Sequence, residues 1–122
     1  MKIRIQGNSI RIRLSKSEVY KLVNQGVVEE KTSFGNASFG YCLKKSAGIT
    51  ALTASYKNDR ITMEVPGSLL LDWPVNQVVG FDATMRISET ETLYLLVEKD
   101  FKCLDNTTED QSDNYENPSK TC

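Results

Sequence analysis

The side chains best placed for chemistry in this sequence are two pairs of carboxylates. Glu98 and Asp100 are two residues apart, and so are Glu89 and Glu91. On a strand this spacing puts both carboxylates of a pair on one face, where they could hold Mg²⁺ or share acid–base work. No nucleophile or phosphate-binding loop accompanies either pair, so a solvated strand face is favoured over catalysis.

The 122-residue chain contains no histidine. This absence excludes Ser-His-Asp and Cys-His catalysis, and every zinc site that uses imidazole. The cysteines, Cys42, Cys103 and Cys122, are odd in number and form no Cys-x-x-Cys pair. Neither a disulfide framework nor a zinc site of four cysteines is expected. We therefore predict no cofactor and no metal site.

Basic residues are concentrated at the start of the chain and acidic residues at its end, although the formal net charge is only -1. The first 21 residues contain six Lys and Arg against Glu18 alone, whereas residues 104–122 contain five Asp and Glu against Lys120. A cationic front and an acidic tail in one small protein indicate that charge governs what it contacts.

Four of the early cations alternate with apolar residues in two short runs, residues 2–6 and 9–14. Gly7-Asn8 between the runs favours a tight reversal, so we predict a β-hairpin. Its inner face would be apolar, and its outer face would carry Lys2, Arg4, Arg11 and Arg13.

Like charges directly opposite each other on a hairpin are unfavourable and need compensation. A bound anion could provide it, because arginine grips phosphate and carboxylate in a bidentate manner. Protein carboxylates such as Glu98 and Asp100 could also provide it, and so could plain solvation. The sequence leaves these three explanations open.

The remaining pattern predicts an α+β fold. Ser15-Lys16-Ser17-Glu18 fits a capping box and predicts a helix over residues 16–25, ended by Gly26. A second short helix is expected between Ser68 and Pro74. Strands are expected at residues 27–33, 38–45, 50–57, 60–65, 77–87 and 92–101, the last in a central position because it is apolar on both faces. Six to eight short strands predict a curled antiparallel or mixed sheet that is barrel-like in its curvature.

Residues 1–103 are expected to form a single domain, followed by an acidic tail over residues 104–122. Hydrophobic residues nearly vanish after Leu104, so the tail is either disordered or docked on the domain. The tail residues of interest are Glu109, Asp110, Asp113 and Tyr115.

Leu70 and Trp73 form the apolar cluster around the second predicted helix. Beside Pro74, Trp73 is expected to cover the core of the sheet. If exposed, the same cluster would be a docking site for a partner protein.

Location and partners follow from what the sequence lacks. No apolar run approaches ~18 residues, and charges interrupt the N-terminus, so we predict neither a membrane span nor a signal peptide, and a cytoplasmic protein. The aromatic residues do not interleave with the basic ones, which argues against nucleic acid. A monomer and a homodimer both remain open.

The two ends of the chain resemble a known family. Residues 1–14 followed by Ser17-Glu18-Val19, and residues 96–104 followed by Glu109-Asp110 and Asn117-Pro118, are similar to the start and end of a family of small uncharacterised bacterial proteins. The resemblance implies no activity. It does imply that the acidic tail is part of the protein.

Three functions remain open, and binding is favoured over catalysis. In the first, the cations Lys2, Arg4, Arg11 and Arg13 bind a small anion or an acidic protein segment, and the acidic tail competes for them. In the second, Glu98 and Asp100 serve a Mg²⁺-dependent phosphohydrolase that resembles the triphosphate-tunnel enzymes, whose opening strand, however, carries glutamates where this one carries cations. In the third, Leu70 and Trp73 make the protein a structural docking module.

Overall fold

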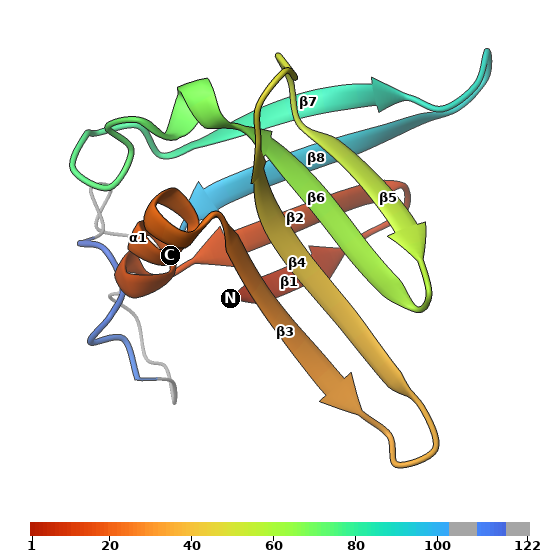
Figure 1. Cartoon of the computed structure of the whole chain (residues 1–122), viewed down its shortest axis with the longest axis horizontal. Helices are drawn as coiled ribbons and strands as arrows, with labels where there is room; N and C mark the ends of the chain where they lie inside the picture. The colour runs from red at the N-terminus through yellow and green to blue at the C-terminus, as the bar shows by residue number, and fades with distance from the viewer. Residues whose placement is uncertain (103–109, 117–122) are drawn as a thin grey trace.

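The computed structural model describes residues 1–102 and 110–116. These residues form two four-stranded sheets packed face to face, with one α-helix at an end of the sandwich (Figure 1). The elements in chain order are β1 (Lys2–Ile5), β2 (Ser9–Leu14), α1 (Lys16–Gln25), β3 (Val27–Ser33), β4 (Ser38–Ser46), β5 (Thr53–Lys57), β6 (Arg60–Pro66), a 3-10 turn (Gly67–Leu70), β7 (Gly80–Arg86) and β8 (Thr92–Lys99).

Both sheets are mixed. Sheet A has the order β1-β2-β8-β7, and sheet B has the order β3-β4-β6-β5. In each sheet the two central strands are parallel, and each edge strand pairs antiparallel with its neighbour. Sheet A therefore joins the first and last strands of the described chain, with all of sheet B between them in sequence.

The hairpin predicted at Gly7-Asn8 forms, and the expected strands on either side of Asn58-Asp59 pair as a second hairpin. Gly7 has a positive φ of 54°, and β1 pairs with β2 across it. Asn58 and Asp59 have φ values of 53° and 57°, and they join β5 to β6. Two successive positive φ angles match the twist of the flanking strands, and Asn and Asp tolerate them well.

Helix α1 begins and ends at the predicted signals. The capping box is present at its start, where the Ser15 N–H donates to the Glu18 carboxylate at 2.9 Å. Gly26 ends the helix with φ 85°, and its N–H donates to the Leu22 carbonyl. Val19 and Leu22 are buried, so the apolar side of the helix covers one end of the core.

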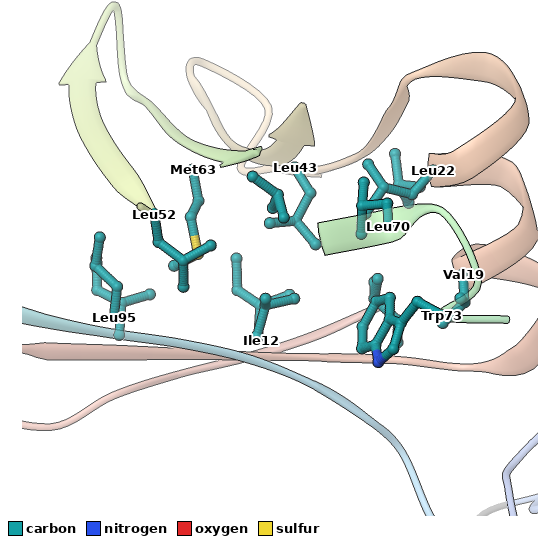
Figure 2. Packing of buried hydrophobic residues seen from close by; sticks show 14 of the residues in the cluster. Ile12, Val19, Leu22, Leu43, Leu52, Met63, Leu70, Trp73 and Leu95 are labelled. Carbon is teal, nitrogen blue, oxygen red and sulfur yellow. The ribbon is translucent and has the colours of Figure 1, made fainter. Parts of the chain in front are cut away.

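The core fills the space between the two sheets (Figure 2). Sheet A contributes Ile12 and Leu95, sheet B contributes Leu43 and Met63, and all four side chains are fully buried. Trp73 is also fully buried. Its ring centroid lies 5.1 Å from that of Phe81, and its Nε1–H donates to the Val78 carbonyl at 2.8 Å. The indole therefore buries its whole ring with its polar group satisfied.

Several predictions of the fold need correction. The second predicted helix is only the 3-10 turn Gly67–Leu70, because Pro66 and Pro74 leave too few residues between them for an α-helix. The strands do not close a barrel within residues 1–102, since they pair as two separate sheets. The central position of the last strand is confirmed, because β8 lies between β2 and β7.

Among residues 1–102 and 110–116, no helix is both long enough and apolar enough to cross a bilayer.

Candidate anion-binding face

The four early cations share one face of sheet A, as predicted. The register of β1 and β2 places Lys2 opposite Arg13 and Arg4 opposite Arg11. On β2 the two arginines alternate with Ile10 and Ile12, which are buried in the core. Because side chains alternate along a strand, the cations point to the outside of the sandwich. We call Lys2, Arg4, Arg11 and Arg13 the basic face.

Strand β8, on the other side of β2, supplies carboxylates to the basic face. The Oε1 atom of Glu98 lies 3.3 Å from Nε of Arg11 and 2.9 Å from Nε of Arg13. The Glu98 side chain is only 15% exposed, whereas the Arg11 and Arg13 side chains are 37% and 43% exposed, so water screens these contacts in part. Nζ of Lys2 lies 2.8 Å from Oδ2 of Asp100. Three explanations were open for how the clustered positive charge is compensated. Carboxylates of the protein itself compensate three of the four cations of the basic face.

Arg4 differs from the other three cations. It lies on the edge strand β1, is exposed, and its Nη2 donates to the side-chain oxygen of Gln6 at 3.2 Å. Within the residues that the structure describes, no carboxylate pairs with Arg4. Its guanidinium and the outer atoms of Arg11 are therefore the part of the basic face best placed to receive an anion.

A shallow depression of about 180 Å³ lies beside these two arginines. Arg4, Arg11 and Ser9 contribute its polar lining, and Leu96 and Tyr94 on β8 contribute apolar surface. Leu96 is the register partner of Arg11, which places the leucine next to the guanidinium stem. This arrangement offers N–H donors to an anion and apolar surface to whatever carries it.

Tyr94 is held in place at the far side of the depression. Its hydroxyl donates to Oδ2 of Asp82 on β7 at 2.9 Å. This hydrogen bond raises the pKa of Tyr94 above its usual range. Tyr94 and Leu96 were not singled out from the sequence. The sequence did contain a signal for them. Residues 92–101 are apolar on both faces, and a strand that packs one face against the core leaves the apolar residues of its other face on the outside of the sheet.

The carboxylates considered for metal chemistry act as counter-ions in this structure. Glu98 and Asp100 each contact a cation of the basic face. Across residues 1–102 and 110–116, no group of three metal-ligating side chains comes together. The triphosphate-tunnel interpretation gains no support from this fold, because it places these side chains inside a barrel, whereas sheet A presents them on its outer surface.

The described part of the tail, residues 110–116, docks at the end of the sandwich. The Asp113 carboxylate accepts hydrogen bonds from the Ser17 hydroxyl at 2.6 Å and the Ser17 N–H at 3.3 Å. These bonds, with one from Ser15, hold the pKa of Asp113 below its usual range. Asp113 thus caps the first turn of α1 from outside the helix. In the described residues, the carboxylate that contacts Arg11 and Arg13 belongs to Glu98, not to the tail.

Tyr115 fixes the tail to the end of β8. Its N–H donates to the Asp100 carbonyl at 2.8 Å, and its ring centroid lies 5.9 Å from that of Phe101. Burial raises the pKa of the Tyr115 hydroxyl to about 12. Nζ of Lys99 lies 4.9 Å from the Tyr115 ring, and burial lowers the pKa of that lysine. Asp110 lines an open depression next to Asp113, whereas Glu109, Cys103 and Cys122 lie outside the described residues.

Leu70 and Trp73, considered as a docking site, are both part of the core. Their neighbours Leu71 and Val75 are the exposed apolar residues of this loop, at 77% and 74% exposure. The inward placement follows from Trp73, whose large ring can be fully buried only if its neighbours on the loop turn outward.

The comparisons with known proteins bear on the family and not on the chemistry. Searches of the curated proteins and of the solved structures found no match to this chain. Residues 1–119 match the model of a family of unknown function (DUF7009), and the chain belongs to that family.

Proposed function

We propose that this protein binds an anionic ligand on the outer face of sheet A, in the depression between Arg4 and Arg11. The observation that carries the proposal is the pairing of these two residues. They are direct neighbours across β1 and β2, and the structure describes no carboxylate that pairs with Arg4. Like charges directly opposite each other on paired strands are unfavourable, and an anion bound between them would offset the repulsion.

The chemistry of the lining defines the ligand. Arginine presents a planar fork of N–H donors that matches phosphate and carboxylate oxygens. Nε of Arg11 lies 3.3 Å from Oε1 of Glu98, and the Arg11 side chain remains 37% exposed, so part of its guanidinium is accessible to a ligand. Leu96 and the ring of Tyr94 add apolar surface beside the cations. An anion attached to a small apolar group fits this combination.

The site predicts modest affinity and strong dependence on salt. The arginines are partly exposed, with 37% of the Arg11 side chain accessible, so ions in solution screen them. The Asp113 carboxylate is engaged with Ser17 of α1, so it does not supply this anion.

Isothermal titration of the full chain with inorganic tripolyphosphate at low salt tests the proposal. Arg4→Gln and Arg11→Gln should each weaken binding by about tenfold, equal to about 1.4 kcal/mol. The matched control is Arg86→Gln, which makes the same charge change on β7, at the opposite edge of sheet A. It should change the affinity by less than about twofold. If Arg86→Gln weakens binding as much as Arg4→Gln, the anion responds to net charge and the site is not the one proposed.

A further inference from the structure

Strand β1 is the open edge of sheet A next to the basic face. Among the residues that the structure describes, it is the terminal strand in the sheet order and pairs with β2 alone (Figure 1). Three of its four residues are exposed, and Ile5 retains 55% of its accessible surface. An edge strand directs half of its backbone N–H and C=O groups away from its own sheet. Such an edge can accept another strand.

The side chains of β1 would present two different surfaces to an added strand. Arg4 lies on the outer side, in line with Arg11. Ile3 and Ile5 lie on the inner side, in line with Ile12 and Ile10. Neighbouring strands are about 4.8 Å apart, so residues of an added strand would lie within direct reach of these side chains.

A second copy of the same edge does not fit these surfaces. Pairing β1 with β1 would add two more rows of Lys and Arg to a face where Arg4 already lies opposite Arg11. Like charges directly opposite one another destabilise a strand pair. An acidic strand, in contrast, would place a carboxylate next to Arg4. Charge complementarity therefore selects a partner with acidic residues.

We infer that β1 accepts an extended acidic segment of a partner protein as an additional strand of sheet A. The segment alternates acidic residues, which face Arg4, with apolar residues, which cover Ile3 and Ile5. Backbone hydrogen bonds to β1 hold the segment, and the alternating side chains select it. This inference rests on the proposed function, because the added carboxylate would engage Arg4, a residue of that site, from the open side of β1.

The experiment uses the full chain and synthetic peptides of alternating Glu and Val. A peptide of the same composition with the Glu and Val residues in separate blocks controls for charge. Two further versions of the alternating peptide are N-methylated on the backbone. In one version every Glu is methylated, and in the other version every Val is methylated. Backbone N–H groups point alternately to the two edges of a strand. In an added strand, the N–H groups of one residue type, Glu or Val, therefore all point toward β1, and those of the other type all point away. N-methylation of one residue type only should therefore abolish binding.

Fluorescence anisotropy of the labelled peptides separates the possible outcomes. The alternating peptide should bind about tenfold more tightly than the block peptide, and Ile5→Ser should weaken its binding. Ile87→Ser, at a residue also about half exposed (51%) but after β7, should not. If block and alternating peptides bind equally and Arg4→Gln weakens both, the anion site stands and strand addition is wrong. If Arg4→Gln affects neither these peptides nor tripolyphosphate, the proposed function itself fails.

Discussion

Arg13 on β2 lies beside Glu98 on β8, with Nε 2.9 Å from Oε1, although 85 residues separate the two in sequence. The same carboxylate oxygen lies 3.3 Å from Nε of Arg11. One partly buried carboxylate therefore offsets the repulsion between two arginines on the same strand. Because β8 is the last strand, this counter-ion reaches the basic face only when the ends of the domain have come together.

Glu98→Gln should increase the affinity of the basic face for tripolyphosphate by several-fold. Removing the negative charge leaves Arg11 and Arg13 without their counter-ion, so their positive charge attracts a ligand anion more strongly. The same change should lower the free energy of unfolding by about 1 kcal/mol, since the arginines are more than a third exposed. Titration calorimetry and urea unfolding measure the two effects. Glu89→Gln, in the turn before β8, is the matched control, and equal affinity gains in both variants would contradict a local role for Glu98.

Asp113→Ala should destabilise the protein at neutral pH by about 1 kcal/mol, because it removes the cap on α1. The pKa of Asp113 is lowered in the folded state, chiefly by hydrogen bonds from Ser17 and Ser15. Its stabilisation is therefore present above the ordinary Asp pKa of about 3.9 and is lost as pH falls through the lower folded value. Urea unfolding between neutral and acidic pH should show the two proteins converging in acid. A difference that stays constant to the acid limit would argue against a charged cap.

Tyr115→Phe should leave the protein at least as stable as the wild type at neutral pH. The Tyr115 hydroxyl is buried and has no hydrogen-bond partner within the described residues, so its removal breaks no contact there. The folded-state pKa of about 12 is above the usual value of about 10. The folded protein thus holds this proton more tightly, and stability should fall as pH rises from about 10 to about 12.

Thermal unfolding in alkaline buffers checks the role of Tyr115. The Phe variant should lose less stability over that range than the wild type. Tyr115→Ala is the contrasting variant, because it also removes the ring that packs against Phe101 and Lys99. Wild-type and Phe curves that fall together in alkali would assign the alkaline loss to another group.

Local parts of this structure were predictable because their signals are short in range. Gly7-Asn8 and Asn58-Asp59 determine two turns, and Ser15 with Glu18 determines the start of α1. Strict alternation then fixes which residues share a face, so the grouping of Lys2, Arg4, Arg11 and Arg13 was predictable as well. None of these features depends on how distant segments pair.

Long-range relationships were not predictable, because they depend on how segments that are distant in the sequence pair with one another. The parallel pairs β2 with β8 and β4 with β6 are set by how the two sheets bury their apolar faces together, which no local pattern encodes. The counter-ion role of Glu98 and the depression beside Tyr94 both depend on that pairing. The tail was expected to compete for the basic face on net charge alone. Its described residues dock on α1 and β8, where Asp113 and Tyr115 find specific hydrogen bonds.

Gly80 is the position where a single methyl group should do most damage to sheet A. A Cβ atom there would collide with the backbone oxygen of Val97 and would lie 2.7 Å from Cβ of Glu98. Neither atom can move without separating β7 from β8, since Gly80 and Glu98 are register partners. Gly80→Ala should therefore lower the free energy of unfolding by about 2 to 4 kcal/mol.

Gly40→Ala is the control for Gly80→Ala, because the added methyl group would lie at ordinary contact distances, 3.5 Å from Cγ of Arg60 and 3.6 Å from the backbone oxygen of Glu30. It should change stability by less than about 1 kcal/mol, since alanine loses less backbone entropy than glycine on folding. Gly80→Ala should also weaken tripolyphosphate binding, because displacing β7 removes Asp82, which holds Tyr94 beside the depression. Urea unfolding and calorimetry on both variants test this. A Gly80→Ala protein with wild-type stability would show that β7 can shift freely against β8, and the positioning of Tyr94 through Asp82 would then be untenable.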